Sequence, residues 1–272
     1  MGTGKIEDLR SSKHFLLLKE QWRLVLEMCH FTEDVNPEWQ NGLIQNTLKT
    51  LSRPAIALTE TYADDETKFR ILCHYFFKQC GYSTAKVSGL QLQDYFLPNI
   101  LKAKAGPAPL VMLLLCTLFG ECDIKAQVIS CRKRYLLKIQ LNTRAYLVDV
   151  EDSCRFLEPF EIVDLINRGF DFSNGTLSTT ALVVEYLEMI KARARVENNS
   201  QVLTLTHGYL MRYQPFNLKH LRERALLAYE TGDYRRAIDD IRSYFQYKQP
   251  GLNNSQLKRI YKLALRRHRL HS

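Results

Sequence analysis

The sequence has no apolar run long enough to cross a lipid bilayer. Its most apolar stretch, residues 110–119 in GPAPLVMLLLCTLF, has ten residues, whereas a membrane-spanning helix needs about twenty. As a helix, this stretch would be apolar on every side, which is typical of a helix buried in a protein core. Gly106 and the prolines at 107 and 109 suit its first turn. We therefore expect a core helix here and no membrane insertion.

Signatures of metal and phosphate binding are also missing. The sequence has no C-x-x-C pair, no glycine-rich phosphate loop, no paired metal carboxylates and no Ser–His pattern. Cys73-His74 lacks a second pair at zinc spacing, so we expect no metal and no cofactor. His74 and His207 fall on otherwise apolar helix faces, where packing in or near the core is the default role.

An export signal and a disulfide framework are absent as well. The first fifteen residues, MGTGKIEDLRSSKHF, contain acids and no apolar segment followed by a small-residue cleavage site. The seven cysteines are an odd number and are widely scattered. Both observations predict free thiols in a reducing compartment, so we expect a cytoplasmic protein.

Positive charge is concentrated at the carboxyl end. The net charge is +9, and the segment after Gln256 carries six cations and no acid, which leaves +3 for the rest of the chain. Such a tail suits binding to nucleic acid or to an anionic membrane, or it is the solvated face of an amphipathic helix. We favour the amphipathic helix, because apolar residues recur opposite the cations at helical spacing. We expect no nucleic-acid partner, because no strand carries aromatic residues arranged to stack bases.

Hydrophobic periodicity predicts a mostly helical α+β fold. Helical patterns cover residues 15–30, 37–51 and 63–80, the second ending before Pro54, and Pro98 fits the first turn of a further helix. Three short β-prone runs follow at 126–131, 134–141 and 144–151, and Asn142-Thr143 is short enough for a hairpin. They predict a small antiparallel sheet packed on the core helix. A helix at 158–168, closed by Gly169, comes next.

The carboxyl-terminal third predicts helices only, after a loop-like segment at 171–180. The segments YLMRYQP and YFQYKQP repeat at a spacing of about 35 residues, which is typical of tetratricopeptide (TPR) repeats. Gly232 is expected to end one helix and Asp233 to cap the next, whereas Arg224 stands where the repeat favours an apolar residue. We therefore expect two domains. Residues 1–178 form an α+β domain that begins with a helical lead-in, and residues 179–272 form a TPR-like domain that ends with a basic helix.

Two segments resemble a known family. LPNILKAKAG is similar to the L-P-x-V-L-x-R-R-G of the bacterial SirB-one family, and LRERALLAYETGDYRRAIDDIRSYF is similar to its R-D-R-G-L-L-Y-x-x-L-G-x-x-x-x-A-x-x-D-L-x-x-Y. These are transglutaminase-like proteins with a carboxyl-terminal TPR region, and the resemblance covers roughly residues 50–272. It implies a papain/transglutaminase-like core, made of a buried helix and a small antiparallel sheet, followed by TPR-like helices.

The resemblance also implies where catalytic residues would lie. In that fold a cysteine begins the central helix, and a histidine and an aspartate lie on the following strands. The matching positions here are Ala108, Arg134 and Asp149, of which only the aspartate is retained. Cys131, followed by three cations, is the alternative nucleophile, because neighbouring cations lower the pKa of an exposed thiol. Cys116, among leucines, is expected to be buried and inert.

Two functions remain open at this point. The first, which we favour, is a non-catalytic scaffold or regulator that binds a protein or peptide partner through the TPR-like helices. The second is a cysteine hydrolase or amide transferase that uses Cys131 with Asp149. For the scaffold we expect Tyr and Arg side chains to anchor the partner, although each of them could instead join the repeats to the core. These candidate partner-binding residues are Tyr209, Tyr213, Arg222, Arg235, Arg236, Tyr244 and Tyr247.

Overall fold

The computed structural model describes residues 25, 27–39, 41–85, 89–131, 134–169, 177–247 and 254–271, and the side chains at 41, 43–45, 131, 134, 179 and 271 lie outside that description. The chain divides into two compact units, Met1–Tyr186 and Leu187–Ser272. The border falls within helix α7 (Thr179–Val196), and the domain division expected at residues 178 and 179 stays a prediction. None of the described helices is long and apolar enough to cross a membrane.

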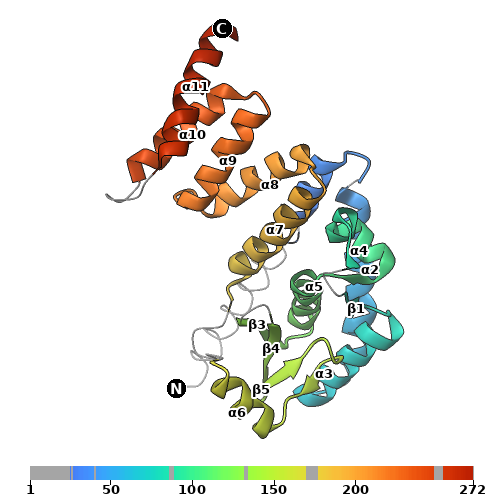
Figure 1. Ribbon diagram of the computed structural model, residues 1–272. Coiled ribbons are helices and arrows are strands. Elements are labelled where there is room, and N and C mark those ends of the chain that lie inside the picture. The colour runs from blue at the N-terminus through green and yellow to red at the C-terminus, as the bar shows by residue number, and fades with distance from the viewer. Residues whose placement is uncertain are drawn as a thin grey trace, which may run out of the picture. The chain divides into compact units, whose positions relative to one another are not determined.

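The first unit is mostly helical and is built around one buried helix, α5 (Figure 1). Residues 27–35 are helical as well, and they bring Met28, Cys29 and Phe31 into the core. The further helical elements, in chain order, are α2 (Asn41–Thr59), α3 (Asp65–His74), the π-helical η1 (Tyr75–Gln79), the 3-10 helix η3 (Leu92–Tyr95), α4 (Leu97–Ala103), α5 (Ala108–Glu121), α6 (Pro159–Asn167) and the first half of α7.

Helix α5 forms where the apolar run predicted it. Every residue from Ala108 to Gly120 is buried, which confirms a core helix. Pro107 is its N-cap residue and Pro109 lies in its first turn, where a missing N–H removes no helical hydrogen bond. A Cβ at Gly106 would lie 2.7 Å from Ile100 Cγ1, so this position has room only for glycine.

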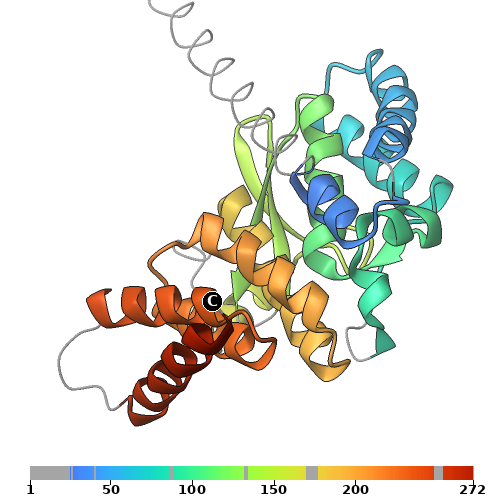
Figure 2. The same ribbon diagram turned by 90° about the horizontal axis from the view of Figure 1, so that it is seen from above.

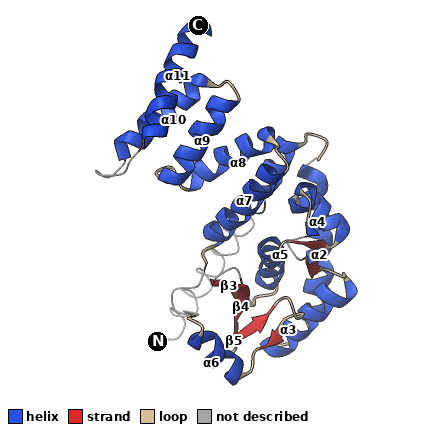
Figure 3. Ribbon diagram, viewed as in Figure 1, coloured by secondary structure: helices blue, strands red, loops and turns tan. Residues whose placement is uncertain are grey.

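A four-stranded antiparallel sheet with the order β3-β4-β5-β6 packs on α5 (Figure 3). The three predicted strands and the hairpin at Asn142 are confirmed, and β4 and β5 run side by side in Figure 2. The fourth strand was not predicted, and neither was a separate parallel pair, β1 (Ser83–Thr84) and β2 (Ala105–Gly106). The strands of the sheet are β3 (Lys125–Cys131), β4 (Arg134–Leu141), β5 (Arg144–Asp149) and β6 (Arg155–Phe156).

The expectation that Pro54 ends a helix is wrong. Helix α2 begins at Asn41 and continues through Pro54 to Thr59. A proline inside a helix cannot donate to the carbonyl four residues earlier, which here belongs to Thr50. Both Thr50 and Pro54 lie on the exposed face, where water can hydrate that carbonyl, while Leu51 and Ala55 hold the opposite face in the core. Burial of that face stabilises the helix on both sides of the proline.

In the second unit the regular elements formed by the described residues are all helices, as predicted. The α9–α10 turn has the expected chemistry: Gly232 has a φ of +86°, and Asp233 Oδ1 accepts the backbone N–H of Arg236 at 3.1 Å. Its helices are the second half of α7, α8 (Ser200–Tyr213), α9 (Leu218–Glu230), α10 (Tyr234–Tyr247) and α11 (Ser255–His271). The basic helix α11 buries Leu257 and Ala264 and exposes its six cations, so the predicted amphipathic face is confirmed.

Arg224, which interrupts the apolar pattern of α9, has a specific partner on α10. Its guanidinium donates two hydrogen bonds to the Asp240 carboxylate, from Nε at 2.8 Å and from Nη2 at 2.6 Å. The Asp240 side chain is only 6% exposed, and the Arg224 side chain is 23% exposed. The pair therefore joins two helices across a largely dry contact, and an apolar residue at 224 would leave a carboxylate buried.

Candidate functional site

Ala108 begins helix α5, at the place where the predicted nucleophile would lie. The amino end of a helix carries partial positive charge and unpaired N–H groups, so it lowers the pKa of a thiol placed there. The side chain of Ala108 is a methyl group, and the residue is 8% exposed. The helix end that could activate a nucleophile therefore holds none at this position.

The strand topology brings the other two predicted positions to one end of the sheet. Strands β4 and β5 are antiparallel, with Leu137 opposite Val148, so Arg134 at the start of β4 and Asp149 at the end of β5 lie at the same end. Only a three-residue connection separates α5 from β3, so α5 runs back along the sheet with its amino end toward that end. The side chains of Arg134 and Cys131 lie outside the described residues.

Asp149 is nearly buried, at 9% exposed, and takes part in a tight turn. Its Oδ1 accepts the backbone N–H of Glu151 at 3.0 Å, and its carbonyl oxygen accepts the N–H of Cys154 at 2.8 Å. Ser153 and Cys154 in this turn have positive φ angles of 51° and 64°. The carboxylate therefore stabilises a strained connection between β5 and β6.

A cluster of buried thiols lies near Asp149. It consists of Cys73 from α3, Cys116 from α5 and Cys154 from the turn. Burial raises the pKa of Cys154 well above its usual value, and a hydrogen bond to Cys73 and the neighbouring acidic groups raise it further. Burial also raises the pKa of Cys116 to about 12. Both thiols are therefore protonated at neutral pH, which makes them poor nucleophiles.

A depression of about 380 Å³ opens beside this cluster, between α3, η1 and the segment at 152–156. Cys73, His74 and Cys154 are among its lining residues, whereas Ala108 and Asp149 are not. His74 is exposed rather than packed in the core. The depression therefore opens onto the thiol cluster, and of the described catalytic positions neither Ala108 nor Asp149 lines it.

The comparison with known families agrees with this architecture. A family model described as the transglutaminase-like superfamily matches residues 43–201, which is more than half of the chain. The chain belongs to the transglutaminase-like superfamily. No curated protein and no solved structure matched it. The transglutaminase-like core expected from the sequence is thus confirmed, while assignment to the SirB-one family and to TPR repeats stays a prediction.

The helical unit of this transglutaminase-like protein contains a larger depression, of about 910 Å³. Four of its lining residues are leucines from α8 and α9, so part of its lining is apolar. Charged side chains of both signs also line it, among them Arg195, Lys219 and Glu223. A lining that mixes apolar and charged side chains is suited to holding a segment of polypeptide.

The predicted partner-binding residues are dispersed over this unit. Arg222 and Tyr244 line the 910 Å³ depression, although Tyr244 is mostly buried and its hydroxyl donates to Asn254 Oδ1 at 3.1 Å. Arg235 and Arg236 line a separate depression of about 320 Å³ beside the Arg224–Asp240 pair. The remaining three are Tyr209, which is buried, Tyr213, which is half-buried, and Tyr247, which is 45% exposed.

Apart from Arg222 and Tyr244, sequence reasoning did not assign the polar residues that share the larger depression to a binding surface. Arg195, Glu223 and His207 come from three helices, and no linear spacing links them. Tyr247, in contrast, packs its ring against exposed Phe216 with centroids 5.0 Å apart. A composition rich in Tyr and Arg indicated binding surfaces in this unit, but it could not assign side chains to one of them.

Proposed function

We propose that this transglutaminase-like protein is a non-catalytic interaction scaffold or regulator. The observation that carries the proposal is the methyl group of Ala108 at the amino end of α5. Transfer of an acyl group through this fold requires an attacking sulfur at the position where the helix field would activate it. Without that atom the helix end retains only its structural role.

The state of the other described groups supports the same function. The described thiols of the cluster near Asp149, at positions 73, 116 and 154, are buried, and Cys116 and Cys154 have raised pKa values. Asp149 itself holds the β5–β6 turn through the N–H of Glu151. A carboxylate occupied in this way is suited to stabilising the fold rather than to orienting a base.

The helical unit is the proposed binding surface, and its partner is a protein or peptide. The 910 Å³ depression, with its mixed apolar and charged lining, supports this assignment. Membership of the SirB-one family, the TPR character of these helices, a domain division at 178 and 179, and a cytoplasmic location belong to the same proposal. We propose no cofactor, nucleic-acid or membrane partner for the transglutaminase-like domain.

The absence of catalysis is tested with a thiol-directed electrophilic probe and an amide-hydrolysis assay on the full chain. We expect no turnover, and no probe labelling at neutral pH of the buried thiols Cys73, Cys116 and Cys154. Ala108→Cys serves as the positive control, because a thiol at the helix amino end has a lowered pKa and is expected to be labelled. Turnover by the unmodified chain would refute the proposal.

The binding role is tested by affinity capture from the native cytoplasm with the full chain. The Arg195→Glu/Arg222→Glu variant reverses two charges that line the depression, and we expect it to lose the captured partner. Arg259→Glu, on the exposed face of α11, is the matched control and is expected to retain it. If the unmodified chain and both variants capture the partner equally, the partner does not bind at the 910 Å³ depression.

A hydrolase or amide transferase that uses Cys131 with Asp149 is the second candidate. Cys131 ends β3 and pairs with Arg134, which places its backbone at the same end of the sheet as Asp149. Probe labelling and amide cleavage that are both abolished by Cys131→Ala, and both unaffected by Cys80→Ala, would establish this candidate. Labelling without cleavage would indicate a reactive thiol that is not a nucleophile in catalysis.

A further inference from the structure

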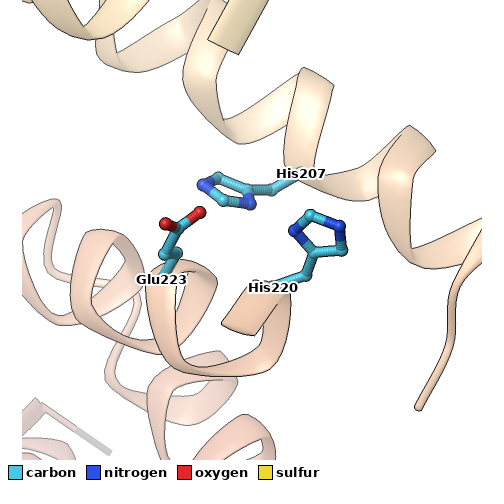
Figure 4. Close-up of side chains that lie close together, drawn as sticks. All are labelled: His207, His220 and Glu223. Carbon is cyan, nitrogen blue, oxygen red and sulfur yellow. The ribbon is translucent and has the colours of Figure 1, made fainter. Parts of the chain in front are cut away.

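Helices α8 and α9 bring two histidines and a glutamate together inside the helical unit. His207, His220 and Glu223 each offer a ligand atom, and the three atoms lie within 4.8 Å of one another. Figure 4 shows the two imidazole rings and the carboxylate turned toward a common space. His220 and Glu223 are three residues apart on α9, so they share one helix face, and His207 approaches from α8.

The histidines have unsatisfied nitrogens. Both residues are 1% exposed, and Nδ1 of each is buried without a hydrogen-bond partner. Buried polar atoms are almost always paired in folded proteins, so two unpaired ring nitrogens in one cluster indicate that a binding partner is missing. The unpaired nitrogens belong to the same residues whose ligand atoms converge.

The protonation of His220 follows from a chain of hydrogen bonds that starts at a helix cap. Asn217 Oδ1 accepts the backbone N–H groups of Lys219 and His220 at 3.0 and 3.3 Å, so the other end of its amide is the NH₂ group. That group donates to Gln214 Oε1 at 2.8 Å, which identifies the Gln214 atom as the oxygen. Gln214 Oε1 lies 2.9 Å from His220 Nε2 and must accept its proton. In the neutral ring, Nδ1 then carries a lone pair.

We propose that His207, His220 and Glu223 bind a divalent transition-metal ion, with Zn²⁺ as the ion that best fits them. Two imidazoles and a carboxylate are a ligand set that zinc uses when three protein ligands leave a fourth position open. An outer hydrogen bond that fixes the ring orientation, as Gln214 does for His220, is the usual support of a histidine ligand. His207 and Glu223 also line the 910 Å³ depression, so a fourth ligand can enter from it.

The charges around the cluster are compatible with a cation. Lys191 is 3% exposed and forms ion pairs with Glu188 at 2.7 Å and with Glu223 at 2.8 Å. Two carboxylates thus face one buried ammonium, so these three groups by themselves carry one net negative charge. Glu223 uses Oε2 for Lys191, so Oε1 is the oxygen that can coordinate the metal, while Glu188 still holds the lysine.

Two further cations border the cluster at longer distances. Arg195 Nη2 lies 3.8 Å from Glu223 Oε2, and Lys219 Nζ lies 3.9 Å from Glu188 Oε1. Their side chains are 57% and 66% exposed, so both can turn toward solvent when a metal ion binds. Their charges therefore weaken metal binding only slightly, because exposed charges are screened by water and salt.

The test is metal binding by the purified full chain, with Zn²⁺ and Co²⁺ as the probes. We expect one Zn²⁺ per chain after dialysis, a thermal midpoint that rises with Zn²⁺ and returns on chelation, and a visible Co²⁺ spectrum without a thiolate-to-metal band. His207→Gln and His220→Gln are each expected to weaken Zn²⁺ binding by at least about tenfold. His30→Gln, an exposed histidine of the first unit, is the control and is expected to bind as the unmodified chain does.

Gln214→Leu keeps the experiment decisive if a ligand variant fails to fold, because Gln214 is a positioning residue and not a ligand. Loss of its contact to Nε2 is expected to weaken Zn²⁺ binding by about 10- to 100-fold. Binding well below one ion per chain, unchanged affinity in the His207 and His220 variants, or a Co²⁺–thiolate band would each overturn the proposal. None of these readouts depends on the scaffold role, so the two proposals fail separately.

Discussion

Replacement of Arg224 by methionine tests how the helical unit stabilises a buried charge. Methionine keeps most of the volume and the apolar stem of arginine, but it removes both hydrogen bonds to Asp240. The carboxylate that remains is 6% exposed and has lost its counter-charge. Removal of one member of such a pair typically costs about 3–5 kcal/mol, because it leaves an uncompensated buried ion.

The two partners should not be equivalent. Asp240→Asn leaves the Arg224 guanidinium without its counter-ion, but that side chain is 23% exposed and can move toward the neighbouring depression. We therefore expect Asp240→Asn to cost less than Arg224→Met. The double variant Arg224→Met/Asp240→Leu should be more stable than Arg224→Met alone, because no charge remains buried.

Hydrogen exchange of the α9 and α10 amides, read by mass spectrometry, measures this effect in the full chain. Both tryptophans, Trp22 and Trp39, precede the helical unit, so fluorescence follows the other unit and serves as an internal control. A loss of about 3 kcal/mol accelerates exchange through opening of these helices by on the order of a hundredfold.

The matched control for this experiment is Arg236→Ala. Arg236 pairs with Asp233 at 3.6 Å, and their side chains are 51% and 46% exposed, so the expected cost is about 0–1 kcal/mol. If Arg224→Met costs no more than Arg236→Ala, the Arg224–Asp240 pair is not the buried ion pair described above, and the reasoning is refuted.

Three further predictions concern local packing, capping and ionisation. Gly106→Ala is expected to cost about 1–3 kcal/mol in urea denaturation, because its Cβ would overlap the γ-carbons of Ile100, and Ile100→Val should not restore the loss because valine keeps both γ-carbons. Asn217→Ala removes the cap of α9 and should lower stability by about 0.5–2 kcal/mol, measured by the same exchange experiment. The pKa of Cys116 is raised to about 12, so the folded chain holds the thiol proton more tightly than the unfolded chain does. The free energy of unfolding should therefore fall as the pH rises from 9 to 12, by about 1.4 kcal/mol per pH unit for this thiol. If the denaturation midpoint stays constant across that pH range, Cys116 does not have a raised pKa. The same holds if Cys116→Ala shows the same pH dependence as the unmodified chain.

Much of the fold was predictable because its signals are local. The apolar run of α5, the β3–β5 strands and the Gly232-Asp233 turn each carry their pattern within about fifteen residues. The exceptions also have physical reasons. A proline is tolerated in α2 because burial on both sides outweighs one lost hydrogen bond, and β1, β2 and β6 are two residues long, too short for periodicity to appear.

The candidate sites were less predictable, because they depend on contacts between helices. His207 was expected to be a packing residue, and its burial agrees, yet its position beside His220 and Glu223 depends on how α8 meets α9. Arg224 occupies a position where the TPR pattern favours an apolar residue. Its partner, Asp240, lies sixteen residues later on the next helix, so the sequence pattern did not indicate the pair. Sequence spacing indicates which face a residue occupies, but not which residue faces it from a neighbouring helix.

The hydrogen bonds that connect Asn217, Gln214 and His220 tie the tautomer of an imidazole to the formation of a helix. In an unfolded chain the ring proton exchanges between both nitrogens. Once Asn217 caps the first turn of α9, the side-chain amides of Asn217 and Gln214 have one orientation. The ring proton of His220 is then held on Nε2. Fraying of that turn would therefore let either ring nitrogen of His220 carry the proton, even if the backbone moved little. The cap residue Asn217 thus determines which nitrogen of His220 is a donor, through Gln214 and without a contact to the ring.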